Sequence, residues 1–220
     1  MTERPILFNA RMIRAILSGD KTQTRRKMKP TKEWSEAVIN ELAPVMKARK
    51  WYQAVEMGPC DGVRRRYSCP YGNPGDRLWV RERFRYYYDE PDLWDCIQYA
   101  DKSLMKPEGL DDYEGHRFSD RCAVDSRWRS PIHMPRWASR ITLAITDVRV
   151  DLLTSITRDD ARAEGVTDAQ AEAGDGYDGN DGSTAAFAAL WESIYGPDSW
   201  TANPWVWVVE FVMEVNSARP

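Results

Sequence analysis

The chain has 220 residues and a mass of 25.4 kDa, which suits one large domain or two small ones. Apolar residues make up 42% of the sequence and charged residues 30%, a balance that supports a real core and excludes general disorder. The 31 Lys and Arg residues against 34 Asp and Glu residues leave a net charge of -3. This charge excludes a uniformly basic coat for nucleic acid but allows local basic patches.

The cellular location is predicted from the lack of a membrane-spanning segment and of a signal peptide in the sequence, together with its few cysteines. Its apolar runs are far shorter than the roughly 20 residues that span a bilayer, and its first residues lack the layout of a signal peptide. Four cysteines in a chain of this length fit a reducing compartment better than a disulfide scaffold. We therefore expect a cytoplasmic protein without membrane contact.

The N-terminal thirty residues predict a strand, a helix and a polar segment. Residues 5–8 are an apolar strand, and Asn9 is a credible helix N-cap. The helix carries one apolar stripe, formed by Met12, Ile13, Ile16 and Leu17. Gly19 stands where a helix-ending left-handed residue is expected. The following residues 20–29 are polar and strongly basic.

One strong strand signal lies between two irregular stretches in the middle of the chain. Residues 77–86 alternate between apolar and arginine side chains, as a central strand does, with Glu82 as the one charged residue on the apolar face. Residues 31–68 are mixed in character and include a predicted helix, Glu36–Lys50. Residues 87–130 show little periodicity. We interpret 31–68 and 87–130 as insertions.

The C-terminal part begins with a strand whose apolar phase changes. Apolar residues alternate over 141–145 and continue in the opposite phase at 148–150, which predicts a bulge or strand end near Asp147. Thr157 then begins a short helix with a capping-box layout, which ends at Gly165.

A loop, a helix and a strand complete the chain. Residues 167–183 are rich in Gly, Asp and Ala and predict a flexible acidic loop. Thr184–Tyr195 is a predicted amphipathic helix. The last strand places its apolar side chains on one face: Trp205, Trp207, Val209, Phe211, Met213 and Val215. Short strands with segregated helices predict a single α+β domain, residues 1–220, with a mainly antiparallel, curved sheet or barrel.

The segment Gly19–Arg26 is the most informative in the chain, because apolar burial cannot explain it. One interpretation is a solvated basic strand edge. The other is a helix-to-strand turn that delivers a lysine and hydroxyls to the rim of a pocket. A lysine there can bind an anion or, if desolvated, lose its proton near neutrality and act as a base.

The pattern Gly-x-Lys-Thr-x-Thr-x-Arg over Gly19–Arg26 resembles the signature of the ASCH domain, a PUA-like β-barrel family. Residues 69–82 and 203–208 resemble segments of the longer, phage-encoded members of that family. The similarity covers three stretches, roughly 4–30, 69–86 and 135–215. It implies a PUA-like (ASCH) β-barrel with flanking helices and loop insertions.

The resemblance also implies an activity. A small bacterial member of the family is an amidohydrolase that removes the acetyl group from N(4)-acetylcytidine. Its activity is ascribed to a lysine, a threonine three residues later and a distant glutamate. Lys21 and Thr24 occupy the motif positions here, and Glu164 occupies the glutamate position in a matching segment, Leu153–Glu164.

These residue types suit the hydrolysis of an amide, which needs a nucleophile, a base and a proton donor for the leaving amine. Thr24 would attack the acyl carbon, neutral Lys21 would accept its proton, and Glu164 would orient groups or shuttle a proton. In a straight strand, residues 21 and 24 point to opposite faces. The pair therefore requires a backbone turn or bulge between them, which Gly19 favours.

Three further residues are candidates for substrate binding. Arg26 belongs to a basic run that can contact phosphates. Glu82 either pairs with a buried arginine such as Arg26 or accepts a hydrogen bond from the amino group of a base. Trp79 faces the charged side of its strand and is a candidate for an exposed stacking ring. Trp205 and Trp207 are in phase with apolar neighbours and are interpreted as core.

The predicted function is a metal-independent amidohydrolase that removes an acyl group from a modified nucleobase or nucleoside such as N(4)-acetylcytidine. We expect no metal and no cofactor, because the cysteines and two histidines lack a zinc spacing and no Gly-rich phosphate loop occurs. The expected partner is a modified nucleoside or RNA. The alternatives are a non-catalytic RNA or modified-nucleotide binding module and an ASCH-type ribonuclease.

Overall fold

A five-stranded sheet forms the centre of the computed structural model, with the strand order β1-β5-β9-β10-β2. The pair β1–β5 is parallel and the other pairs are antiparallel. The strands are β1 (Glu3–Leu7), β2 (Gln23–Lys27), β5 (Arg77–Arg81), β9 (Thr142–Leu152) and β10 (Trp205–Glu214). The structure describes residues 1–30, 35–49, 55–57, 65–89, 94–105, 127–173 and 182–214.

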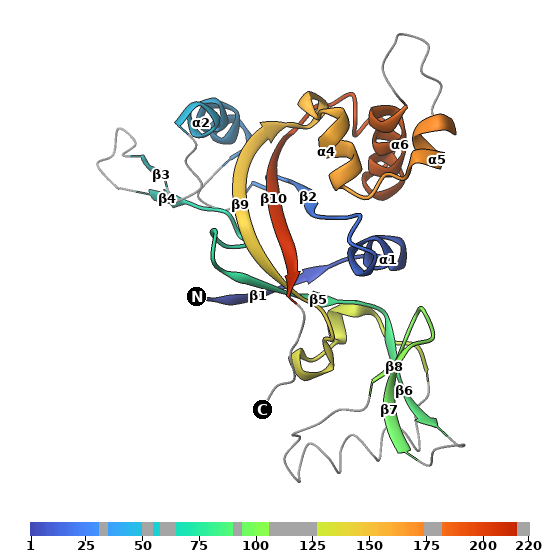
Figure 1. Cartoon of the computed structure of the whole chain (residues 1–220). Helices are drawn as coiled ribbons and strands as arrows, with labels where there is room; N and C mark the ends of the chain where they lie inside the picture. Colours follow the sequence, from blue (N-terminus) through green and yellow to red (C-terminus); the bar gives the residue numbers. More distant parts are fainter. Residues whose placement is uncertain are drawn as a thin grey trace.

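The helices lie around this sheet (Figure 1). They are α1 (Ala10–Leu17), α2 (Glu36–Arg49), α4 (Arg158–Ala163), α5 (Asp168–Ala173) and α6 (Ser183–Tyr195). Short 3₁₀ turns occur at Pro131–His133, Arg136–Ala138 and Leu153–Ser155. The predicted α+β class is therefore confirmed. The expected closed barrel is not: among the described residues no ladder pairs β1 with β2, so these two strands are the edges of an open sheet.

The two longest strands, β9 and β10, curve across the sheet and carry a bulge (Figure 1). Glu210 pairs with Asp147, and the next residue, Phe211, pairs with Ile145, so Thr146 is left without a partner in the ladder. An extra residue bends its strand and inverts the face on which the following side chains lie. The predicted change of phase near Asp147 is confirmed.

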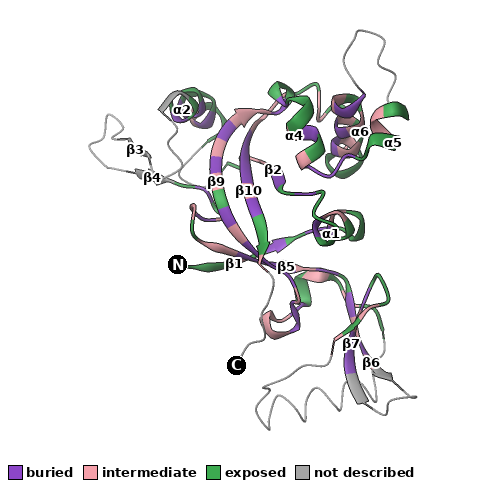
Figure 2. Cartoon of the chain, in the orientation of Figure 1, coloured by how far each residue is buried: buried purple, intermediate pink, exposed green. Residues whose placement is uncertain are grey.

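Both faces of β10 are buried from Val206 to Val209, which explains why this part of the strand is apolar at every position, whereas Val212 and Met213 near its end are exposed (Figure 2). Trp207, Val209 and Phe211 belong to the main core with residues of α1 and α2. Val206 and Val208 pack on the other face in a second core with residues of α4 and α6. The interpretation of Trp205 and Trp207 as core is confirmed for the buried Trp207 and for the half-buried Trp205, which packs against the same cluster.

Local signals at the helix ends are confirmed in detail. The side chain of Asn9 accepts a hydrogen bond from the backbone N–H of Met12 at 2.9 Å. Thr157 and Asp160 form a reciprocal capping box at the start of α4. The predicted flexible loop at 167–183 is wrong in its first part, because α5 is helical and packs against α6. Residues 174–181 of that loop lie outside the described residues.

The first predicted insertion, 31–68, contributes to the core. Its helix α2 runs through Pro44 and buries Ile39, Leu42 and Met46 in the main cluster. Val45, on the same helix, is exposed. A short hairpin, β3 (Val55–Met57) with β4 (Arg65–Tyr67), follows. Residues 31–34, 50–54 and 58–64 lie outside the described residues.

The second predicted insertion, 87–130, contains a small sheet of its own. The single strand predicted over 77–86 is divided, because β5 ends at Arg81 and the chain leaves the main sheet. The strands β6 (Phe84–Asp89), β7 (Trp94–Tyr99) and β8 (Leu104–Met105) then form a three-stranded sheet. This sheet has a separate core of Phe84, Tyr86, Ile97, Tyr99, Met134 and Ala138. Residues 90–93 and 106–126 lie outside the described residues.

None of the described helices is both long and apolar enough to cross a bilayer.

We expect Trp207→Ala to lower the free energy of unfolding by about 3–5 kcal/mol, because it leaves a cavity at the centre of the main core. The measurement is urea denaturation followed by circular dichroism. The control is Val212→Ala on the same strand, whose side chain is 52% exposed and should change stability by less than about 0.5 kcal/mol. Equal small effects of both variants would contradict the assignment of Trp207 to the core.

Candidate active site

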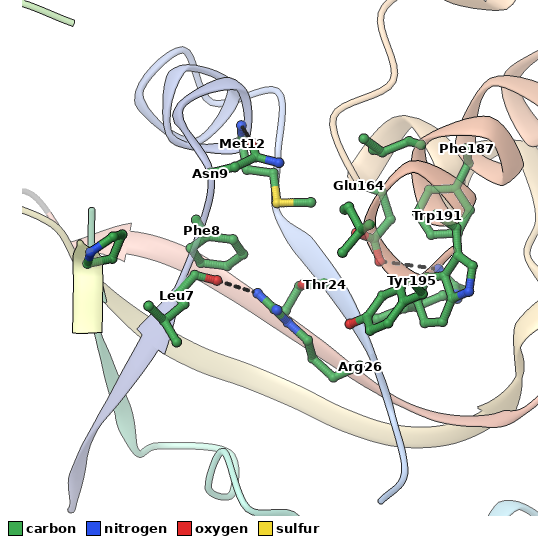
Figure 3. Close-up of a pocket in the computed structure, with 14 residues that line it drawn as sticks. Leu7, Phe8, Asn9, Met12, Thr24, Arg26, Glu164, Phe187, Trp191 and Tyr195 are labelled. Atoms are coloured by element: carbon green, nitrogen blue, oxygen red, sulfur yellow. Dashed lines mark hydrogen bonds and ion pairs between the residues drawn. The ribbon is translucent and has the colours of Figure 1, made fainter. Parts of the chain in front are cut away.

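A pocket with a cavity volume of about 290 Å³ opens between the β1–α1 turn, β2, the end of α4 and α6 (Figure 3). Its apolar wall includes the rings of Phe8, Trp191 and Tyr195. The remaining apolar lining residues are Leu7, Met12, Pro131, Phe187, Leu190 and Ile194. Its polar lining consists of Asn9, Thr24, Arg25, Arg26 and Glu164. The pocket therefore brings the predicted Thr24 and Glu164 together across 140 residues of sequence (164 − 24).

Lys21 is placed by the ends of two helices. Gly19 has a φ of 84° and ends α1, after which the N–H of Lys21 donates to the carbonyl of Ala15. Lys21 then forms an isolated antiparallel bridge with Glu164, the residue that ends α4. Because β2 begins only at Gln23 and Lys21 is bridged to Glu164 outside that strand, Lys21 and Thr24 do not belong to one regular strand.

The ammonium group of Lys21 is fully buried and has three oxygen acceptors. Its Nζ donates to Glu164 Oε2 at 2.7 Å, to the Glu164 carbonyl at 2.9 Å and to the Gln23 carbonyl at 2.7 Å. Burial lowers the pKa of Lys21 below its ordinary value, while the charge and the hydrogen bond of Glu164 oppose this shift. Lys21 is not itself a lining residue, so it lies behind Thr24 and Glu164 in the wall of the pocket.

The two carboxylate oxygens of Glu164 have different environments. Oε2 accepts the hydrogen bond from Lys21, whereas Oε1 is buried and has no hydrogen-bond partner among the described residues. The Arg25 Nη1 lies 3.7 Å from Oε1, an ion pair without a hydrogen bond, which the dashed line at Glu164 in Figure 3 marks. A carboxylate oxygen of a pocket-lining residue that lacks a hydrogen bond can accept one from a ligand, because leaving it unsatisfied is costly.

Arg25 also has N–H groups without a hydrogen bond. Its Nη2 donates to Asp160 Oδ2 at 3.0 Å, but Nε and Nη1 are buried without a hydrogen-bond partner in the described part of the chain. Asp160 also accepts from Arg149 at 2.7 Å. Burial disfavours the charge of Asp160, but hydrogen bonds from Thr157 and the charges of Arg25 and Arg149 hold its pKa below the ordinary value. Asp160 therefore holds Arg25 in place through one nitrogen only.

The hydroxyl of Thr24 lies on the pocket wall and makes no hydrogen bond to another described residue. In Figure 3 it lies between Phe8 and Arg26 on one side and Trp191 and Tyr195 on the other. Thr24 is thus free to contact a ligand.

The three predicted substrate-binding residues have different outcomes. Arg26 lines the pocket, donates from Nη2 to the Leu7 carbonyl at 2.6 Å and stacks over Phe8 at 5.2 Å. Glu82 does not line it. Its partner is Arg140 and not Arg26: Nε and Nη2 of Arg140 each donate to one Glu82 oxygen at 2.8 Å.

Trp79 was expected to be an exposed stacking ring, and this expectation is wrong. Its side chain is only 8% exposed. The guanidinium groups of Arg81 and Arg136 lie over the ring, at 4.6 Å and 5.8 Å from its centroid. Stacked arginines therefore cover the charged side of the strand. The alternation of apolar and charged residues in the sequence cannot indicate this stacking.

Sequence reasoning missed several lining residues. Arg25 stands in the lysine motif but was interpreted only as part of a charge run. Trp191 and Ile194 belong to the predicted amphipathic helix Thr184–Tyr195, and both line the pocket, with Ile194 45% exposed. Tyr195 stacks near Trp191 with a centroid distance of 4.2 Å. In the sequence, only the aromatic residues of α6 indicated that this helix could line a ligand pocket.

Among the described residues, no group of three or more His, Cys, Asp or Glu side chains could hold a metal ion. No family model, curated protein or solved structure matches the chain in the comparisons.

We expect Gly165→Ala to be more destabilising than Gly19→Ala. Both glycines have a positive φ, 91° and 84°, so both substitutions introduce a backbone strain of about 1–2 kcal/mol. A Cβ at residue 165 would also lie 3.0 Å from the Cβ of Ala15 and 3.3 Å from that of Lys21, whereas one at residue 19 meets nothing within 4 Å. Overpacking should add about 1–3 kcal/mol at Gly165.

The free energies of unfolding of the two variants, measured in urea, give this difference directly. Equal losses of unfolding free energy would mean that the backbone around the Lys21–Glu164 bridge shifts to accept the new Cβ without destabilising the protein. The close approach of these segments would then not be required for stability.

Proposed function

We propose that the protein is a metal-independent amidohydrolase that removes an acyl group from a modified nucleobase or nucleoside such as N(4)-acetylcytidine, on a PUA-like ASCH fold. One observation carries the proposal. The Thr24 hydroxyl and the unpartnered Glu164 Oε1 line one aromatic pocket, and the buried amine of Lys21 is hydrogen-bonded to the second oxygen of Glu164. A nucleophile, a base and an acid are the groups that amide hydrolysis needs.

The size and lining of the pocket suit a flat, polar ring. A volume of about 290 Å³ is at the lower end for small-molecule sites, which favours a single base over a duplex. The rings of Phe8, Trp191 and Tyr195 offer faces for stacking. The buried Nε of Arg26 and Nε1 of Trp191 lack partners among the described residues and can donate to the ring nitrogen and carbonyl oxygen of a pyrimidine.

The first chemical step begins within the hydrogen bond between Lys21 and Glu164. In the resting state the three acceptors around Nζ indicate an ammonium group, because a neutral amine has only two hydrogens to donate. Transfer of one proton over the 2.7 Å contact gives a neutral Lys21 and a protonated Glu164. Burial favours this transfer, because it removes two charges from a site with little solvent.

Neutral Lys21 then accepts the proton of the Thr24 hydroxyl as the oxygen attacks the acyl carbon. The Nε and Nη1 of Arg25, which have no hydrogen-bond partner among the described residues, can stabilise the oxyanion that forms. Collapse breaks the carbon–nitrogen bond, and Glu164 donates its proton to the leaving amine. These two proton transfers return Lys21 to the ammonium form and Glu164 to the carboxylate form. Water then attacks the acyl-threonine, the bond between the acyl carbon and the Thr24 oxygen breaks, one proton of the water returns to that oxygen, and the acyl group leaves as a carboxylate with the other proton released to solvent.

A non-catalytic module that binds RNA or a modified nucleotide is the second candidate. The saturated hydrogen bonding of Lys21 favours it, because an amine with three acceptors can be wholly structural. In that case the unpartnered groups of Arg25, Arg26 and Glu164 would recognise a base without reacting.

We expect the purified protein to convert N(4)-acetylcytidine to cytidine and acetate, followed by liquid chromatography. Thr24→Val preserves the shape of the side chain but removes the hydroxyl, and should lower kcat/KM by at least about a hundredfold. Thr22→Val is the matched control, because Thr22 is exposed and is not a lining residue. It should retain the activity of the parent protein.

The outcomes separate the two candidates. Full turnover by Thr24→Val would remove Thr24 from the mechanism. If the parent protein binds the nucleoside, as measured by calorimetry, but releases no acetate, the binding module is favoured and the hydrolase is contradicted.

A further inference from the structure

Three arginines at alternate positions, Arg81, Arg83 and Arg85, stack on aromatic rings outside the pocket. Arg81 lies 4.6 Å from the Trp79 ring centroid. Arg83 and Arg85 lie 5.3 Å and 5.1 Å from the Trp128 ring. Arg85 also lies 5.0 Å from the Tyr87 ring. We call Arg83, Arg85, Tyr87 and Trp128 the arginine–aromatic surface.

The arginines of this surface are not neutralised. Neither Arg83 nor Arg85 forms an ion pair with a carboxylate in the part of the chain that the structure describes, and the one side-chain hydrogen bond of Arg85 goes to the neutral Gln98. Other arginines of the same region behave differently, since Arg136 pairs with Glu3 and Arg140 with Glu82. A stacked guanidinium uses its face for the ring and keeps its edge N–H groups for an anion.

The surface is also accessible to a partner. Arg83 is exposed, and Trp128, at 37% exposed, is among the exposed large apolar side chains. A planar cation and a ring side by side suit two groups that alternate along a polynucleotide, namely phosphate and base. Bases stack on aromatic rings and on arginine planes alike.

Two backbone connections lead from this surface to the pocket. Arg81 pairs with Leu7 at the end of β1, and Leu7 lines the pocket. On the other side, Arg129 forms a bridge with Phe84, and Pro131, two residues further on, lines the pocket. The surface and the pocket are therefore joined through Arg81 and Leu7 on one side and through residues 129–131 on the other.

We propose that the arginine–aromatic surface binds single-stranded RNA and presents one modified cytidine of that strand to the pocket. The choice of RNA rests on the proposed function, whose substrate is a ribonucleoside. A single strand fits better than a duplex, because only an unpaired base can leave its stack and enter a pocket of this size. A protein partner would need carboxylates for the arginines and would make no use of the exposed ring planes.

The test uses fluorescence anisotropy with a labelled, unmodified 12-nucleotide oligocytidine RNA. Trp128→Ala should weaken binding about tenfold or more, as expected for the loss of one stacking ring. Arg83→Gln should reduce the slope of log affinity against log salt by about 0.7, the contribution of one phosphate contact in a single strand. The control is Arg158→Gln on α4, which lies far from β6 (Figure 1) and is exposed. It should leave both the affinity and the slope unchanged.

Several results would overturn the proposal. If Trp128→Ala and Arg83→Gln bind RNA as tightly as the parent protein does, the arginine–aromatic surface does not bind RNA. Tighter binding of poly-glutamate than of RNA would assign the surface to an acidic protein. Equal binding of duplex RNA would contradict presentation of an unpaired base, and equal binding of DNA of the same sequence would contradict the assignment to RNA.

Failure of this inference can be distinguished from failure of the proposed function. Unmodified RNA reports on the surface whether or not any hydrolysis occurs. For free N(4)-acetylcytidine, Arg83→Gln should keep the parent kcat and KM, because Arg83 does not line the pocket. When N(4)-acetylcytidine is part of an oligonucleotide, Arg83→Gln should raise KM severalfold and leave kcat unchanged.

Discussion

Lys21 and Glu164 place two opposite charges in the interior of the protein, and their contact joins the end of α1 to the end of α4. Two desolvated charges are expensive, and good geometry with further hydrogen bonds is needed to offset the cost. The structure supplies both through the Glu164 and Gln23 carbonyls. Removing one partner of such a pair typically costs about 3–5 kcal/mol. Glu164 is therefore part of the framework of the protein as well as of its pocket.

The same pair gives the pocket its chemical character. Because one oxygen of Glu164 is held by a hydrogen bond from Lys21, the other is oriented but has no hydrogen-bond partner among the described residues. Arg25 repeats this arrangement, since one nitrogen donates to Asp160 while two others have no hydrogen-bond partner in the described part of the chain. Buried polar groups are rarely left unsatisfied. Their concentration around an aromatic cavity is the strongest structural argument that the cavity receives a polar ligand.

The arginines that seemed equivalent in the sequence have three different environments. Arg25 is buried beside carboxylates, Arg140 is locked in a bidentate pair with Glu82, and Arg83 lies stacked on a ring without a carboxylate. Charge density alone predicts a solvated face for all of them. The environment of each depends on which acidic or aromatic residue the fold brings beside it, and those residues are distant in sequence.

The sequence by itself determined the local features: the cap at Asn9, the left-handed Gly19, the capping box at Thr157 and the bulge near Asp147. Each depends on residues a few positions apart, so short-range hydrogen bonding and side-chain periodicity are sufficient. The lysine motif likewise indicated Lys21 and Thr24. Only the tertiary structure decided that β1 and β2 are the two edge strands of an open sheet, that Glu82 pairs with Arg140, and that Trp79 is covered. These outcomes depend on contacts between segments that are distant in the sequence. A local pattern of residues carries no information about the energies of such contacts.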